Sequence, residues 1–220
     1  MKSLIPFFIL TTLIISLQNC AQTSTEAETT PSTEVTPQET GDPVTDLDGF
    51  FTEEIPGSDL VRVFKEDADG NILEDGFLRN GIKQGPWLTY ERVFIYPKSI
   101  TNYDNGVVHG IYMEFTPSGQ VALQAFYREN TLHGSWSRFK GGRMEASGYY
   151  KEGVLHGVYK EFMPLFGRLQ KEIHYKDGQQ HGPYRYYNDD GQITMEYIYK
   201  NGEKESGGIV DPPRDPEPAE

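Results

Sequence analysis

Residues 151–162 read K-E-G-V-L-H-G-V-Y-K-E-F, and four other stretches of the chain repeat this pattern. The other copies begin at residues 79, 104, 128 and 176, and the first of them has glutamine in place of the histidine. The second glycine of each copy recurs every 23 to 25 residues, at Gly85, Gly110, Gly134, Gly157 and Gly182. Gly207 lies 25 residues further on and indicates a broken sixth copy. A fixed period of this length is typical of a tandem-repeat architecture.

Each repeat divides into two strands and two turns. A turn dipeptide such as Asn105-Gly106 precedes the histidine–glycine pair, where glycine adopts positive φ at little cost. The short strand that follows carries aromatic residues three positions apart, such as Tyr112 and Phe115. This spacing places them on opposite faces of the sheet unless a bulge intervenes. After a second turn the chain runs with a period of two, which predicts a half-buried strand with one face formed by Val121, Leu123, Ala125 and Tyr127.

These strands predict an all-β fold, an elongated single-layer antiparallel meander of tandem β-hairpins with a repeat of about 24 residues. Two strands in each of five repeats give about ten to twelve strands. Stacked copies place like residues beside like, so we expect an aromatic ladder from Tyr127, Tyr150, Tyr175 and Tyr199. The predicted segments are a lipoprotein signal peptide (1–19), a disordered acidic tether rich in Thr, Glu and Pro (20–59), the repeat domain (60–207) and a disordered acidic tail (208–220).

The amino-terminal segment has the features of an exported lipoprotein. After Lys2, an almost unbroken apolar run from Leu4 to Leu17 is short for a membrane span and suits a secretory signal. The sequence Leu17-Gln-Asn-Cys20 resembles the lipobox of Bacteroidota-type bacterial lipoproteins, which implies that Cys20 is lipidated and becomes the first residue. We therefore expect a lipid anchor in the cell envelope, in the outer membrane rather than the inner one, on its periplasmic or its surface side. The alternative is an ordinary cleaved signal or an uncleaved anchor, with Cys20 incidental.

The net charge of −13 is concentrated outside the repeats. Residues 60–204 hold 18 basic and 18 acidic side chains, whereas residues 21–59 hold ten acidic side chains and no basic one. The sequence has no basic stripe of the kind that binds nucleic-acid phosphates. We therefore exclude nucleic acid as a partner. A single cysteine also excludes an internal disulfide bond.

Four of the five histidines occupy one position of the repeat: His109, His133, His156 and His181. Equivalent positions in successive hairpins are two strands apart, about 9–10 Å at the usual strand spacing. Ligands of one zinc ion each lie about 2 Å from it, so neighbouring histidines are too far apart to share a metal ion. We predict no metal and no other cofactor. Each imidazole, and the repeat glycine after it, is expected to have a structural role at a turn.

The sequence contains no pattern typical of an active site. It has no G-x-S-x-G motif, and its glycines recur with the repeat and precede strands, unlike those of a phosphate-binding loop. We therefore predict a protein without enzymatic activity and without catalytic residues. Exposed aromatic surface often marks a binding site, so we take the aromatic residue two positions after each repeat glycine as a candidate binding surface: Trp87, Tyr112, Trp136, Tyr159 and Tyr184. The alternative is that these rings form the packing ladder of the sheet.

The turn glycine, the histidine–glycine pair and the following aromatic residue resemble the MORN repeat in its bacterial variant form. The pattern is particularly similar to the family of YwqK-type antitoxin components, and the resemblance covers about residues 62–207. It implies a stack of twisted β-hairpins that serves as a scaffold or a binding surface for membrane lipids or proteins. We therefore expect a membrane-anchored lipoprotein whose repeat sheet is a non-catalytic binding or scaffolding module for a protein or glycan partner. The alternative is an antitoxin or immunity-type protein that neutralises a toxin by direct binding.

Overall fold

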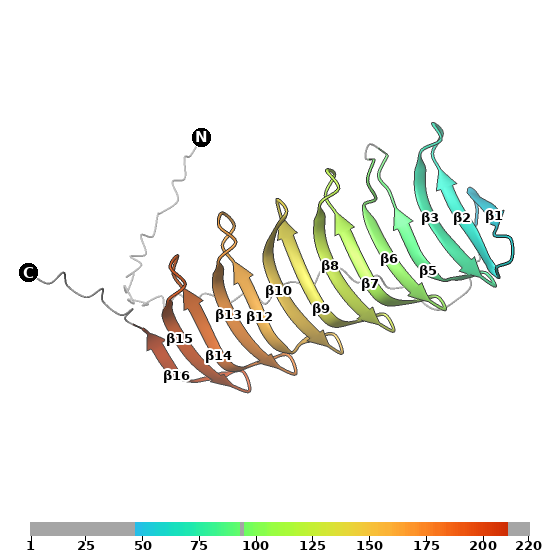
Figure 1. The fold of residues 1–220 in the computed structure, drawn as a ribbon. Coiled ribbons are helices and arrows are strands. Elements are labelled where there is room, and N and C mark those ends of the chain that lie inside the picture. The colour runs from blue at the N-terminus through green and yellow to red at the C-terminus, as the bar shows by residue number, and fades with distance from the viewer. Residues whose placement is uncertain (1–46, 93–94, 211–220) are drawn as a thin grey trace, which may run out of the picture. The chain divides into compact units, whose positions relative to one another are not determined.

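The computed structural model describes residues 47–92 and 95–210 of the protein. These residues contain strands and no helix, and neighbouring strands pair antiparallel in one sheet (Figure 1). The strands are β1 (Phe50–Glu54), β2 (Leu60–Glu66), β3 (Ile72–Arg79), β4 (Ile82–Lys83), β5 (Gly85–Thr89), β6 (Ser99–Asp104), β7 (Val107–Phe115), β8 (Val121–Arg128), β9 (Thr131–Lys140), β10 (Arg143–Lys151), β11 (Val154–Leu155), β12 (Gly157–Phe162), β13 (Leu169–Lys176), β14 (Gln179–Tyr187), β15 (Ile193–Lys200) and β16 (Glu203–Ile209). In this described part of the chain, no helix has the length and apolar character needed to cross a membrane.

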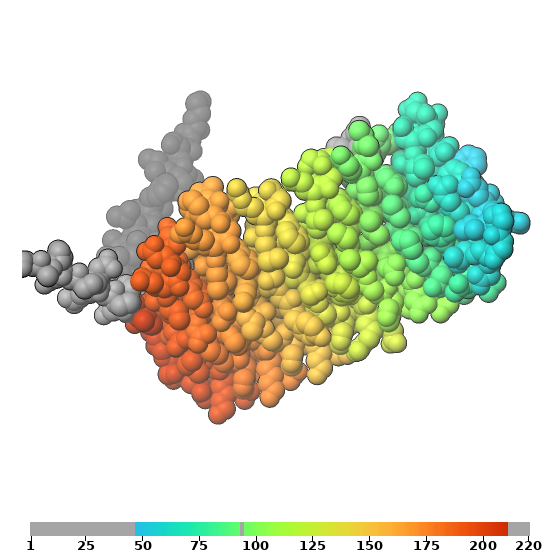
Figure 2. Space-filling model, in the orientation of Figure 1, coloured from blue at the N-terminus to red at the C-terminus, as the bar shows by residue number. Residues whose placement is uncertain are grey.

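The predicted all-β meander is confirmed. Strand order in the sheet follows chain order, and the space-filling view shows the chain colour changing steadily from one end of the sheet to the other (Figure 2). The predicted count of ten to twelve strands is too low, because the sheet has 16. Two of the additional strands, β4 and β11, are two-residue segments beside the main path, and β1 and β2 precede the first copy of the repeat.

The predicted limits of the repeat domain are too narrow. β1 begins at Phe50, ten residues before the predicted boundary at 60, and pairs with β2 along its whole length. Phe51 stacks on Phe64 with ring centroids 5.3 Å apart, and Phe50 lies 6.2 Å from Trp87, so each face of β1 has an aromatic contact. At the other end, β16 continues to Ile209. Residues 1–46, which contain the predicted signal peptide, Cys20 and most of the predicted tether, lie outside the described residues, as do residues 211–220.

Each repeat glycine lies where the strand pairing is irregular. Between the pairs Thr101–Tyr112 and Tyr103–Val108, three residues of β7 lie opposite one residue of β6. Gly110, in this insertion, has a φ of 97°. The other four repeat glycines also have positive φ, between 74° and 112°. Because side chains with a Cβ rarely adopt this conformation, the glycine after each histidine is a backbone requirement of the repeat.

A second irregularity of the strand pairing lies beside the second residue of each aromatic pair. The pairing of β7 with β8 shifts between Glu114 and Phe115, where β8 has the extra residue Ala122. The same shift recurs where β12 pairs with β13 and where β14 pairs with β15. A bulge therefore exists in these hairpins, and it lies on the partner of the strand that carries the aromatic pair.

One face of the sheet, called here the ring face, holds the buried aromatic side chains. Large rings on one strand lie over small residues on the next: an added Cβ on Gly76 would be 2.2 Å from Cε3 of Trp87, and one on Gly148 would be 3.1 Å from Cδ2 of Tyr159. The predicted tyrosine ladder is present in an interleaved form, because each of its members contacts a ring of the adjacent strand. These ring pairs are Tyr112–Tyr127, Trp136–Tyr150, Tyr159–Tyr175 and Tyr184–Tyr199. Alternation of large and small residues lets a single layer bury its rings without a second sheet.

Candidate functional site

The aromatic residues predicted as a candidate binding surface are buried, so that prediction is wrong and the packing alternative is correct. The fraction of each residue that is exposed to solvent is small: Trp87 4%, Tyr112 7%, Trp136 5%, Tyr159 2% and Tyr184 1%. The small residues on the neighbouring strands make this burial possible, and their effect cannot be read from the aromatic positions alone. Of these five rings, Tyr112 nevertheless lines the edge of a hollow described below.

Three of the repeat histidines accept a hydrogen bond from a turn backbone, and that turn belongs to the next hairpin. The backbone N–H groups of Glu152, Asp177 and Asn201 donate to Nδ1 of His133, His156 and His181, each at 3.4 Å. In the degenerate first copy, Oε1 of Gln84 accepts the equivalent bond from Asn105 N–H at 3.0 Å. These side chains therefore connect successive hairpins along the edge of the sheet that carries the short turns. His109, the remaining member of the row, is exposed.

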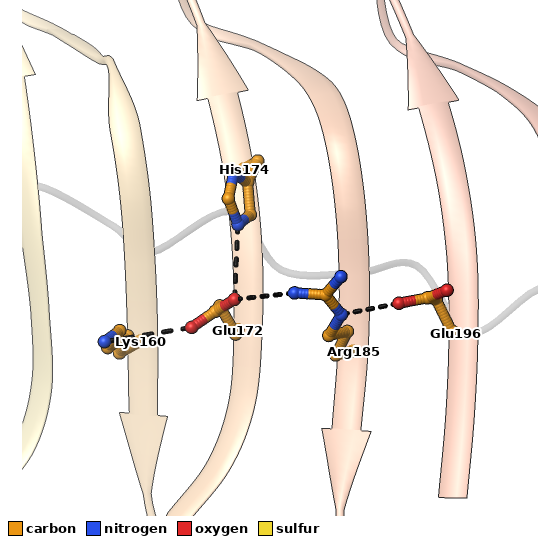
Figure 3. A network of polar contacts seen from close by, with 5 residues as sticks. All are labelled: Lys160, Glu172, His174, Arg185 and Glu196. Carbon is orange, nitrogen blue, oxygen red and sulfur yellow. Dashed lines mark hydrogen bonds and ion pairs between the residues drawn. The ribbon is translucent and has the colours of Figure 1, made fainter. Parts of the chain in front are cut away.

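No group of three or more His, Cys, Asp or Glu residues in the described segments 47–92 and 95–210 is arranged to hold a metal ion. Titratable side chains gather instead on the face opposite the rings, called here the reverse face. There Lys160, Glu172, Arg185 and Glu196 are cross-strand neighbours on β12 to β15 (Figure 3).

The reverse-face charges alternate in sign and are paired with one another. Glu172 contacts Lys160 Nζ at 3.8 Å, Arg185 at 3.3 Å and His174 Nε2 at 3.2 Å. Arg185 Nε also contacts Glu196 at 2.5 Å, and this hydrogen bond raises the pKa of the Arg185 guanidinium. Such a network contributes to the cohesion of neighbouring strands more than an isolated surface pair does. Because its charges neutralise one another, it is a poor candidate for recognition of a charged ligand.

A better candidate is a hollow on the ring face, beside the edge that carries the longer loops. It has a volume of about 610 Å³ and is lined by Leu73, Glu74, Thr89, Tyr90, Glu91, Lys98, Ser99, Tyr112, Glu114 and Phe115. A smaller hollow of about 160 Å³ adjoins it and is lined by Glu91, Tyr96, Pro97, Lys98, Phe115, Thr116 and Pro117. We call the two together the loop-edge furrow. Its walls come from β3, β5, β6 and β7 and from the two loops at their ends.

The loop-edge furrow exists because one connection is longer than its equivalents. Residues 90–98 join β5 to β6, whereas residues 116–120 and 188–192 make the corresponding connections further along the sheet. Backbone bonds hold the base of the long loop, since Tyr90 N–H donates to Leu73 O and Lys98 N–H donates to Thr89 O, both at 2.7 Å. Farther out, Tyr96 lies against Gly119 so closely that a Cβ there would be 2.6 Å from the ring. Tyr96 of the longer loop therefore packs against the neighbouring loop.

The polar groups of the furrow are fixed by bonds to its own walls. Glu74 accepts from Trp87 Nε1 at 3.1 Å, and Glu114 accepts from the hydroxyl of Tyr112 at 2.7 Å. Burial, together with this bond to Glu114, raises the pKa of Tyr112 well above its ordinary value. On the loop side, Lys98 Nζ contacts Glu91 at 2.7 Å, which raises the pKa of the lysine. The furrow thus presents carboxylates whose positions are set before any ligand arrives.

Two hydroxyl groups lie in the floor of the furrow. The hydroxyls of Thr89 and Ser99 are 2.7 Å apart on the adjacent strands β5 and β6. Hydroxyl groups both donate and accept, so this pair can exchange its mutual bond for a bond to a ligand.

The repeat pattern of the sequence does not predict the furrow. The signal that could have indicated it is the stretch 90–98, Y-E-R-V-F-I-Y-P-K, which lengthens one connection in an otherwise regular repeat. Long loops in a regular scaffold commonly carry function. Neither a family model nor a curated protein matches this chain, so its function has to be argued from its own geometry.

Proposed function

We propose that this protein is a non-catalytic binding module, held at the cell envelope by a lipid on Cys20, which binds a protein partner in the loop-edge furrow. The observation that carries the proposal is the furrow itself. Rings, hydroxyls and carboxylates converge there in a hollow of about 610 Å³, which lies within the usual size range of ligand sites.

The rest of the sheet supports this choice by contrast. On the ring face the aromatic side chains are used in packing, and on the reverse face the charges of β12 to β15 are paired with one another. A partner would gain little by replacing contacts that are already satisfied. In the furrow, by contrast, the exposed side chain of Tyr96 and the half-buried one of Phe115 are available to a partner.

Site-specific photo-crosslinking in cells tests the binding site. A photo-reactive phenylalanine derivative replaces Tyr96 in the furrow or, as the matched control, Tyr149 on β10. The two tyrosines are similarly exposed, at 50% and 44%. We expect a discrete crosslinked product from position 96 and none from position 149. Absence of a product at 96, or the same product at both positions, would overturn the proposal.

Metabolic labelling with an alkyne fatty acid tests the anchor. The native protein should be labelled and recovered with the membrane fraction, and Cys20→Ala should lose the label and leave that fraction. An unlabelled native protein in the cytoplasm would contradict the anchor and leave the furrow proposal to be judged by crosslinking alone.

A further inference from the structure

The geometry points to a specific kind of partner for the loop-edge furrow: an extended peptide segment that carries proline rings and a basic side chain. This inference rests on the proposed function, since it names what the furrow binds.

The shape of the furrow suits an extended ligand. Its two hollows are adjacent, because both are lined by Glu91, Lys98 and Phe115. The larger hollow lies over the strands and the smaller one lies between the two loops, so the path runs from the face of the sheet to its edge. A peptide without its own internal hydrogen bonds can follow such a path, and the polyproline II conformation is the extended form that needs none.

The apolar walls are made of flat rings and prolines. Tyr90 and Phe115 line the larger hollow, and Tyr96, Pro97 and Pro117 line the smaller one. Rigid pyrrolidine rings pack well on such aromatic surfaces, and a peptide already extended by proline loses little conformational entropy on binding. The contact between Tyr96 and Gly119 holds one of these walls in place before binding, which lowers the entropic penalty further.

The charge of the furrow selects a basic ligand. Glu74, Glu91 and Glu114 line it with a single lysine, Lys98, so three negative charges and one positive charge leave a balance of −2. Each carboxylate can accept about four hydrogen bonds. The bond that Glu114 accepts from Tyr112 and the bond that Glu74 accepts from Trp87 therefore leave both carboxylates able to accept more. A lysine or arginine of the partner can donate those further hydrogen bonds.

The same charge argues against two other occupants. The proline-rich end of this chain, residues 211–220, carries four acidic residues and one arginine, so the furrow repels it. A neutral sugar would find rings, hydroxyls and carboxylate acceptors in the furrow, but it carries no positive charge to match the excess of carboxylates. Electrostatic complementarity therefore favours the basic peptide.

Fluorescence anisotropy with synthetic peptides and the full chain in detergent tests the inference. The probe is a labelled peptide with prolines at every third position and two arginines. One comparison peptide has glutamate in place of arginine, and another has alanine in place of proline. We expect the probe to bind about tenfold or more tightly than the glutamate peptide, since a charge-assisted hydrogen bond corresponds to about that factor. It should also bind more tightly than the alanine peptide, which keeps the arginines but is not held extended before binding.

Variants of the furrow separate its charge from its fold. Glu114→Gln keeps an oxygen that accepts from Tyr112 and should weaken probe binding about tenfold. Lys98→Gln removes the single positive charge of the furrow and should tighten probe binding. Glu203 is an exposed residue of β16, and Glu203→Gln is the matched control, which should leave probe binding unchanged.

The outcomes distinguish the partner class from the binding site. If all three peptides bind equally, or if Glu114→Gln and Glu203→Gln behave alike, the inference is wrong. Binding of neutral oligosaccharides instead of the probe would also refute it, while crosslinking at position 96 would preserve the proposed function. Failure of both the peptide binding and the crosslinking would remove the furrow as a site altogether.

Discussion

At the scale of single residues, the sheet depends on small side chains as much as on large ones. Val63 and Gly76 face each other across β2 and β3, and Trp87 lies over Gly76 from β5. In the next hairpins, Ala125 pairs with Trp136 and Tyr159 lies over Gly148. Each ring has room to lie flat because its neighbour has little or no side chain. The small residues therefore determine how deeply the rings are buried.

The substitution Gly76→Ala tests this dependence. The new Cβ would meet the Trp87 ring at 2.2 Å, so the ring has to move, and overpacking of this kind typically lowers the free energy of unfolding by about 1–3 kcal/mol. Gly208→Ala is the control, because no atom lies within 4 Å of a Cβ at that position. Urea denaturation of both variants measures the difference. Equal stabilities would show that Trp87 can move to accommodate the added methyl group and that its packing over residue 76 is not tight.

Buried tyrosines make the stability of the sheet depend on alkaline pH. Burial raises the pKa of Tyr127 and of Tyr150 to about 12, whereas tyrosine in an unfolded chain titrates near pH 10. Because the folded-state pKa is the higher one, this contribution to stability is fully present below about pH 10 and is lost as the pH rises towards about 12. We expect the free energy of unfolding to fall over this interval.

Urea denaturation at a series of alkaline pH values measures that decrease, and the ultraviolet absorbance of phenolate reports the ionisation directly. Tyr150→Phe removes one of the titrating groups and should lose less stability than the native protein over the same interval. An identical pH profile for both proteins would show that Tyr150 does not contribute to the effect.

At the scale of elements, successive hairpins are joined by a recurring pair of bonds at their short turns. The backbone N–H of the second turn residue, such as Gly153 or Gly178, donates to the carbonyl of the residue before the histidine in the preceding hairpin, at 2.9 Å. The histidine then accepts from the N–H of the first turn residue, which has positive φ at Glu152 and Asp177. Both orphan N–H groups of the turn thus have partners. The repeat period is maintained by this connection as well as by the strand pairing.

The native chain contains a control for the histidine bond, because Gln84 makes it in the first copy. We expect His156→Ala to lower the free energy of unfolding by about 0.5–1.5 kcal/mol, the usual net contribution of one hydrogen bond. His156→Gln should retain most of the native stability. Amide hydrogen exchange at Asp177, whose N–H donates to His156, gives a local readout of the same bond. If both variants lose equal stability, the ring packing of the histidine matters and its acceptor does not.

At the scale of the whole molecule, the sequence predicts the repeated parts and misses the irregular ones. The period, the turns and the role of the histidines were predictable because each copy shows the same pattern. β1 was missed because Phe50-Phe51 is an isolated apolar pair in an acidic, polar segment and does not alternate. The furrow was missed because four strands and two loops form it together, and no single window of sequence contains it. Its residues become a site only through the pairing of β3 to β7.

The meander also determines how the protein should unfold, because its contacts are between neighbouring strands. An end strand has only one neighbouring strand. The pairing of β16 is weaker still, because Tyr197 of β15 faces the ring of Tyr184 on β14 but faces Gly207, which has no side chain, on β16. The ammonium group of Lys204 covers the Tyr197 ring instead, 3.8 Å from its centroid. We therefore expect amide exchange to be fastest in β16 and slowest in the central strands β8 to β10.

Lys204→Ala should accelerate the exchange of β15 and β16 by about two- to fivefold, which corresponds to the 0.5–1 kcal/mol of an exposed cation–π contact. The exchange of β8 should not change, since the strands from β9 to β14 lie between it and β15. Lys140→Ala, at an exposed position at the end of β9, is the control and should leave β15 and β16 as they are. Hydrogen exchange followed by mass spectrometry resolves these segments. An equal acceleration in every strand would instead mean that the sheet opens as one cooperative unit, and the nearest-neighbour account of its stability would be wrong.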